Sequence, residues 1–145
     1  MSSALYSIDV LRRAASVADF PLLTDHDAKA ERRSPTCGSR MTITLKLDDE
    51  DRIAAIGVDA KACALGQAAA AIFAASALGA DRADIESASN QWSAYLSGER
   101  DELPDWEGLE LLAAGRDYPA RHPSMRLAFE AAAAALAARD AGEAS

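Results

Sequence analysis

The chain is poor in cysteine and in positive charge. Two cysteines in 145 residues are too few for the disulfide framework of a small secreted domain. The 15 Lys and Arg residues are outnumbered by 23 Asp and Glu, which gives a net charge of −8. This balance argues against a nucleic acid or an anionic membrane surface as a partner, because phosphate groups are bound by clustered basic residues.

Targeting and membrane signals are also missing. Residues 1–20 contain no basic segment followed by a continuous apolar run, so they do not have the pattern of a signal peptide. The most apolar stretch, residues 64–80, is mostly alanine, which contributes little to membrane insertion and favours a buried helix. We therefore expect a cytoplasmic protein with reduced thiols.

Common catalytic and nucleotide-binding motifs are absent as well. The sequence contains no phosphate-binding loop, no dinucleotide fingerprint, no H-E-x-x-H zinc helix and no G-x-S-x-G nucleophile. The acidic run Asp48–Asp51 lacks the spacing of a calcium loop and is typical of a solvated turn. We expect that the protein is not an enzyme and has no catalytic residues.

Apolar periodicity indicates which elements are present. Three- and four-residue spacing predicts a helix over 2–20, and strict alternation predicts a strand over 41–47. A second strand over 52–59 follows the acidic turn, so the two strands form a hairpin. The charged segment 24–34 fits either a loop or a half-exposed edge strand.

The second half of the chain is rich in alanine, the best helix former, and predicts a largely helical region. The expected helices span 63–78, 81–96 and 123–139, with a short helical piece over 109–114. Together these elements predict one α+β domain over residues 1–145. It would have a small antiparallel sheet, an N-terminal helix and a helical C-terminal half.

The two cysteines occupy positions that suggest one site. Cys37 lies in a turn between Pro35 and Gly38, and Cys63 lies at the start of a predicted helix, whose partial positive charge stabilises a thiolate. Antiparallel strands return to the same end of a sheet, so the hairpin brings both thiols to one edge. A buried structural cysteine is the alternative for each residue taken alone.

His122 is the third candidate site residue. It precedes a proline that is well suited to start a helix, so it is expected in a turn, where its imidazole can bind a metal or carry a proton near neutral pH. A solvated histidine without a role is the alternative. His26 lies in a polar segment and is assigned no role.

The segment Pro35-Thr36-Cys37-Gly38, followed by a hairpin and by Ala62-Cys63-Ala64 at the start of a helix, resembles the IscU/NifU-type iron–sulfur cluster assembly scaffolds. The SufU-like branch is the most similar. Tyr118-Pro119-Ala120-Arg121 ahead of the last helix resembles the stretch that carries the family's third cysteine. The resemblance covers nearly the whole chain and implies a scaffold or sulfur-acceptor function.

The resemblance also implies a ligand set, from which this chain departs at two positions. Cys37 and Cys63 match the family's cysteines and would bind a transient [2Fe–2S] cluster or zinc. Ser39 stands where the family has an acidic residue, and Ser124 stands where it has its third cysteine. His122, two residues before Ser124, and a carboxylate such as Asp59 are the candidates to replace a missing ligand, and neither is a ligand in the family.

The implied partners are a cysteine desulfurase, which supplies persulfide sulfur, and apo iron–sulfur proteins or a downstream carrier, which receive the cluster. Two alternatives remain open. The chain can be a paralogue that keeps the fold as a binding or regulatory module without a cluster. It can also be a thiol redox protein in which Cys37 and Cys63 form a reversible disulfide.

Overall fold

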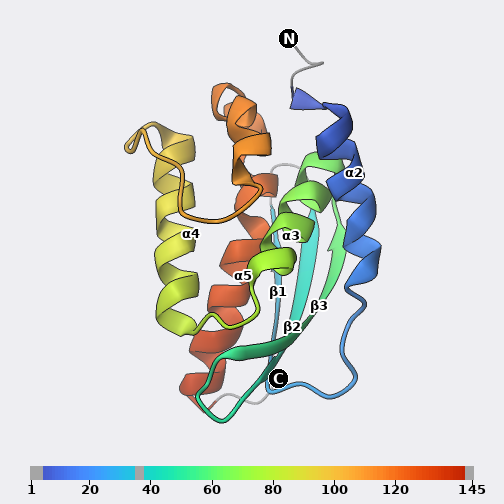
Figure 1. Ribbon diagram of the computed structural model, residues 1–145, viewed down its shortest axis with the longest axis vertical. Helices are drawn as coiled ribbons and strands as arrows, with labels where there is room; N and C mark the ends of the chain where they lie inside the picture. The colour runs from blue at the N-terminus through green and yellow to red at the C-terminus, as the bar shows by residue number, and fades with distance from the viewer. Residues whose placement is uncertain (1–4, 35–37, 143–145) are drawn as a thin grey trace.

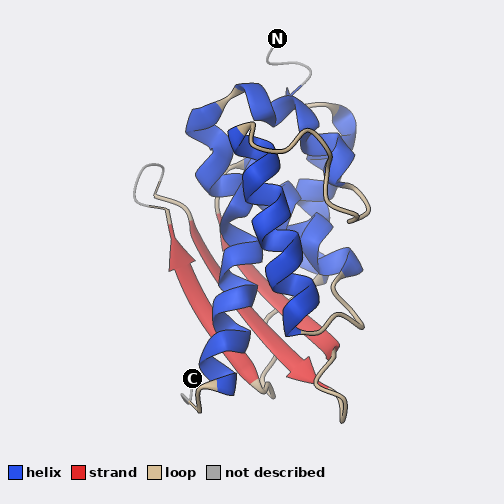
Figure 2. Ribbon diagram, turned by 90° about the vertical axis from the view of Figure 1, so that its left-hand side faces the viewer, coloured by secondary structure: helices blue, strands red, loops and turns tan. Residues whose placement is uncertain are grey.

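The computed structural model describes residues 5–34 and 38–142. A three-stranded antiparallel sheet forms one layer, and helices cover one of its faces (Figures 1 and 2). This arrangement confirms the predicted α+β class. The elements are α2 (Ile8–Ser16), η1 (Val17–Asp19), β1 (Ala28–Arg33), β2 (Arg40–Leu47), β3 (Ile53–Lys61), α3 (Ala64–Ser76), α4 (Arg82–Ser97), η2 (Leu109–Asp117), η3 (Pro119–Arg121) and α5 (His122–Asp140).

The sheet has the strand order β1-β2-β3, with both neighbouring pairs antiparallel. The predicted hairpin is β2–β3, and its register pairs Arg40 with Lys61 at the end where β2 begins and β3 ends. The charged segment 24–34, for which a loop and a strand were both open, contains the edge strand β1. Its solvated outer edge explains why so many of its residues are charged.

The N-terminal helix is shorter than the sequence indicates. α2 begins after Ser7, whose Oγ accepts a hydrogen bond from the backbone N–H of Val10, at 3.3 Å. The last turn of the predicted helix is the 3₁₀ helix η1, and Pro21 comes two positions after its last residue, Asp19. The chain tightens before it stops, as is common at helix ends.

Residues 20–23, which we call the strap, connect this helical region to the sheet. The backbone N–H of Val58 donates to the carbonyl of Phe20 at 2.7 Å, and the backbone N–H of Leu23 donates to Thr44 Oγ1 at 3.0 Å. Gly57 lies beneath the crossing, where an added Cβ would be 2.5 Å from the carbonyl oxygen of Pro21. The close approach of two backbones therefore requires glycine at this position.

Small side chains and a few large rings fill the core. Alanines line the facing sides of α3 and α5 and let these helices approach closely, while α5 also packs on β1 and β2. The rings of Phe73 and Trp106 stack at 5.4 Å between centroids, and Phe129 meets both edge-on. Trp92 is fully buried, and its Nε1–H donates to the carbonyl of Met125 at 2.9 Å.

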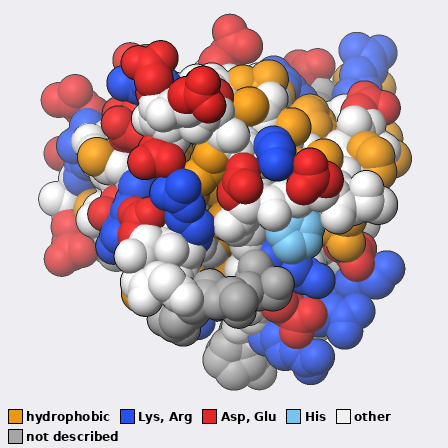
Figure 3. All heavy atoms as spheres, turned by 90° about the horizontal axis from the view of Figure 1, so that it is seen from below, with side chains coloured by type: hydrophobic (Ala, Val, Ile, Leu, Met, Phe, Trp, Pro, Cys, Tyr) orange, Lys and Arg blue, Asp and Glu red, His pale blue; other side chains and the backbone are white. Residues whose placement is uncertain are grey.

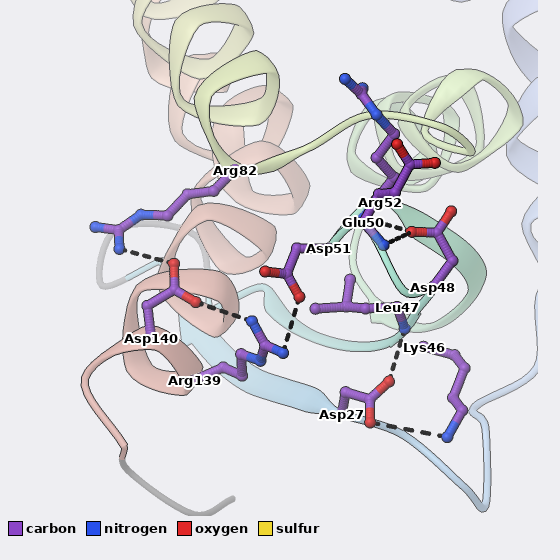
Figure 4. Close-up of polar contacts among 10 residues, drawn as sticks. All are labelled: Asp27, Lys46, Leu47, Asp48, Glu50, Asp51, Arg52, Arg82, Arg139 and Asp140. Carbon is purple, nitrogen blue, oxygen red and sulfur yellow. Dashed lines mark hydrogen bonds and ion pairs between the residues drawn. The ribbon is translucent and has the colours of Figure 1, made fainter.

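The end of the molecule that carries the β2–β3 turn is covered by charged side chains of both signs (Figure 3). Arg139 bridges Asp51 and Asp140, at 3.0 and 3.2 Å, and Arg82 also reaches Asp140, at 3.1 Å (Figure 4). These side chains are largely solvated, so each ion pair stabilises the fold only slightly. In residues 5–34 and 38–142, no helix is long and apolar enough to cross a membrane.

Candidate functional site

Three segments that are far apart in the sequence meet at the opposite end of the sheet, toward the top of Figure 1. They are the residues before β2, the start of α3 and the start of α5. The antiparallel register of β2 and β3 places Ser39 and Ala62 at the same end of the hairpin. Arg40 pairs with Lys61, and Ser39 directly precedes Arg40 while Ala62 directly follows Lys61. This convergence defines the candidate site.

The loop that contains Cys37 is closed by two backbone hydrogen bonds. The N–H of Ser34 donates to the carbonyl of Ser39 at 2.8 Å, and the N–H of Gly38 donates to the carbonyl of Ser34 at 3.0 Å. Gly38 has a φ of +72°, which glycine adopts without strain. Cys37 itself lies outside the described residues, so its proximity to Cys63 stays a prediction.

Cys63 is the N-cap residue of α3, one position before the first helical residue, Ala64. Its backbone is extended, and its carbonyl accepts the first hydrogen bond of the helix from Gln67, at 2.9 Å. The side chain makes no capping hydrogen bond, and the half-buried thiol is free. The thiol therefore lies at the start of α3, where the first N–H groups of a helix have no partner within the helix, and its partial exposure leaves it open to a partner protein.

The charged residues closest in sequence to Cys63 are paired with each other. Lys61 Nζ lies 3.4 Å from Asp59 Oδ1, and both side chains are substantially exposed. Because of this ion pair, the positive charge of Lys61 is partly offset by the carboxylate of Asp59 and does not act on the Cys63 thiol alone. It also gives Asp59 a partner other than a metal.

Ser39 and Ser124, which we call the serine pair, are buried in contact with each other at the site. Their Oγ atoms lie 3.4 Å apart, and the two residues are 4% and 1% exposed. Gly66, in the first turn of α3, packs against Ser124, because an added Cβ would lie 3.5 Å from the Cβ of that serine. The start of α5 thus contacts both the residues before β2 and the helix that carries Cys63.

His122 is the first residue of α5 and its ring is directed toward η2. Its Nε2 lies 3.0 Å from the carbonyl oxygens of both Gly115 and Arg116, so this nitrogen carries the proton and donates to them. Two residues along a helix correspond to a turn of about 200°, which places His122 and Ser124 on different faces of α5. The role of His122 as a metal ligand stays a prediction.

Comparison with known proteins assigns the family. Residues 6–104 match the family model of the NifU-like N terminal domain, which is more than half of the chain. The chain belongs to this family. The resemblance seen in the sequence is thereby confirmed, whereas no curated protein matches the chain.

Solved structures share the fold of this NifU-like domain along nearly its whole length. A nitrogen-fixing NifU-like protein (N-terminal) from Brucella abortus is 29% identical, with a TM-score of 0.84 and 98% of each chain covered. A putative iron–sulfur cluster assembly scaffold protein for the SUF system from Fervidobacterium islandicum AW-1 is 17% identical. Its TM-score is 0.81, with 94% of this chain and 99% of that chain covered.

The solved structure of a hypothetical protein is also similar, at 21% identity and a TM-score of 0.69. The match covers 88% of this chain and 96% of that chain. The two lower identities show a common fold and leave the chemistry of the site to be argued from this chain's own residues.

The donors that the structure describes at the site of this NifU-like domain do not form a closed four-ligand metal site. Within the described ranges, no group of three or more His, Cys, Asp or Glu side chains is placed to hold a metal ion. Cys63 is the described thiol at the site, and the serine pair adds two hydroxyls, with Ser124 packed against Gly66 in the helix that Cys63 caps. Iron–sulfur clusters and zinc favour thiolate or imidazole, for which serine is a poor substitute.

Sequence reasoning found some of these site residues and missed another. It placed Ser39 and Ser124 at ligand positions by resemblance, and the structure brings both together. It missed Gly66, whose lack of a side chain lets α3 approach Ser124. The available signal was a glycine in the first turn of an otherwise alanine-rich helix, three residues after Cys63.

Proposed function

We propose that this chain works in iron–sulfur cluster assembly, as a scaffold or sulfur acceptor that acts through the thiolates of Cys37 and Cys63. Family membership supports the general role. The protein from Fervidobacterium islandicum described as a putative scaffold for the SUF system has the same fold. The observation that carries the proposal is the position of Cys63, a half-exposed free thiol at the start of a 13-residue helix.

In this proposal, sulfur arrives as the persulfide of a cysteine desulfurase in the cytoplasm. The thiolate of Cys63 attacks the outer sulfur, the bond between the two persulfide sulfurs breaks, and the desulfurase cysteine leaves as a thiolate. Cys63 is then a persulfide, and no electrons are gained or lost overall. The free N–H groups at the start of α3 stabilise the attacking thiolate, and the partial exposure of its side chain gives the partner access.

Iron is the second substrate, and a [2Fe–2S] cluster is the cargo that passes to an apo iron–sulfur protein or carrier. Zinc is an alternative occupant of the same thiolates. A site that transfers its cargo benefits from being incompletely ligated, because a closed set of four strong ligands would retain the metal. The small number of strong metal ligands at the site is consistent with a cluster that is bound only transiently.

The test begins with protein purified without oxygen. The wild type is incubated with a cysteine desulfurase and cysteine, and bound sulfur is located by mass spectrometry. Ferrous iron and sulfide are then added, and cluster formation is followed by visible absorption. We expect sulfur on Cys63 or Cys37 and an absorbing species that the double variant Cys37→Ser/Cys63→Ser does not form.

A matched control is Ser76→Ala, at the far end of α3, which should behave as the wild type. Equal sulfur uptake and equal absorption in the double cysteine variant would overturn the proposal. A wild type that takes up neither sulfur nor iron would instead favour the second candidate, a NifU-like binding or regulatory module without a cluster. The serine pair is the observation that favours this second candidate.

A further inference from the structure

The serine pair lies at the junction of the three segments that form the site. Ser39 precedes β2 and Ser124 is in the first turn of α5, 85 positions apart in the chain. Both residues are almost completely buried. The pair is therefore a buried part of the site, packed against the first turn of α3 through Ser124, and does not consist of surface hydroxyls.

Hydroxyls in this environment are weak metal ligands for two reasons. A serine oxygen is a hard, neutral donor that loses its proton only with difficulty, whereas iron–sulfur clusters and zinc favour thiolate and imidazole. The two oxygens also contact each other at 3.4 Å in a buried setting, so ligation would require one of them to leave that contact. The pair thus closes this side of the site without contributing a soft ligand.

We propose that Ser39 and Ser124 limit how firmly this site holds metal, so that iron or zinc is retained through thiolate alone and is released readily. This inference deepens the proposed function and rests on it. Ser124 is the decisive member. The Cβ that Gly66 lacks would lie 3.5 Å from its Cβ, and Gly66 is three residues after Cys63 in the same helix. A thiol at position 124 would therefore stand beside the turn that begins at Cys63.

The experiment replaces the pair in two directions and measures metal binding directly. Ser124→Cys adds a soft ligand, and Ser39→Asp/Ser124→Cys adds a carboxylate as well. Ser39→Ala and Ser124→Ala remove each hydroxyl. The probes are cobalt(II), whose charge-transfer absorption reports thiolate ligation, and zinc, whose affinity is measured by competition with a chromophoric chelator. Thermal unfolding of each apoprotein shows whether the variant is folded.

We expect Ser124→Cys to intensify the cobalt–thiolate absorption and to tighten zinc binding at least about tenfold, a change of the size that altered metal environments produce. The double variant should bind more tightly still. Both alanine variants should bind as the wild type does. Ser76→Cys is the control for a thiol placed away from the site, because it makes the same serine-to-cysteine change at the end of α3 far from Cys63. It should not tighten zinc binding.

Three results would overturn the inference. The first is a wild type that already binds zinc as tightly as Ser124→Cys. The second is a folded Ser124→Cys protein whose cobalt spectrum and zinc affinity do not change. The third is a drop of tenfold or more in either alanine variant, which would make the hydroxyls ligands. The proposed function fails separately, if sulfur and iron uptake do not depend on the native cysteines.

Discussion

Gly57 offers a sharp test of how the N-terminal region is attached to the sheet. Replacing it with alanine adds one methyl group beneath the strap, where the ideal Cβ position is 2.5 Å from the carbonyl oxygen of Pro21. The same position is 2.6 Å from the Cα of Leu22 and from Oγ1 of Thr44. Two of these three neighbours are backbone atoms, which cannot rotate away as a flexible side chain can. The strap must therefore lift off β3.

The size of the effect follows from what the strap would lose. Overpacking of this kind costs about 1–3 kcal/mol. Lifting the strap also breaks the hydrogen bonds from Val58 to Phe20 and from Leu23 to Thr44, each contributing about 1 kcal/mol. The better strand propensity of alanine returns at most about 1 kcal/mol. We expect the free energy of unfolding to fall by about 2–4 kcal/mol.

Urea unfolding followed by circular dichroism measures this change, with an expected drop in melting temperature on the order of 10 °C. Amide hydrogen exchange gives a local readout, since the N–H groups of Leu23 and Val58 should lose protection first. Ala54→Val adds bulk at an exposed position of the same strand and should change stability by less than about 0.5 kcal/mol. A Gly57→Ala protein that loses less than about 1 kcal/mol and keeps both amides protected would refute the reasoning.

Three further predictions concern the helices. The backbone N–H of Asp84 donates to the carboxylate of Asp81 and lowers the pKa of that N-cap residue, so its stabilising effect is present near neutral pH and is lost below about pH 4. Thermal unfolding from pH 7 to 2 should show this loss, and it should be smaller in Asp81→Asn. Gly66→Ala places a methyl 2.7 Å from the Cβ of Ala62. Although alanine has the better helix propensity, this crowding should loosen the start of α3 and make the thiol of Cys63 more accessible. The thiol should then react faster with a thiol reagent while the secondary structure is unchanged. Trp92→Phe removes the indole hydrogen bond to a carbonyl of α5 and should cost about 1–3 kcal/mol in urea unfolding, whereas equal stability would mean that the bond contributes nothing.

Much of the fold was predictable because its signals are local. Alternating apolar residues over 41–47 predict β2, and the acidic turn after them predicts the hairpin, since side chains alternate across a strand regardless of what packs on them. Asp81 and Gly98 mark the ends of α4 by their capping chemistry, which involves only neighbouring residues.

Other elements were ambiguous because the decisive neighbour is distant in the sequence. β1 carries four charged side chains in six residues, so its own pattern does not separate a strand from a loop. The segment is a strand because its backbone pairs with β2. As an edge strand it leaves one side of its backbone exposed to water, and it therefore tolerates charged side chains. The direction of the His122 ring was equally hidden, since it depends on the carbonyls of η2.

The sequence by itself determined that two thiols flank a hairpin and that one of them begins a helix. Both facts depend on order along the chain and on local propensity. Only the tertiary structure decided which side chains pack against the start of α3. Ser39 and Ser124 are 85 positions apart and meet because α5 packs across β1 and β2, and Gly66 lets α3 approach them. Contacts of this kind are set by how helices and sheet pack together, and no periodicity in the sequence encodes them.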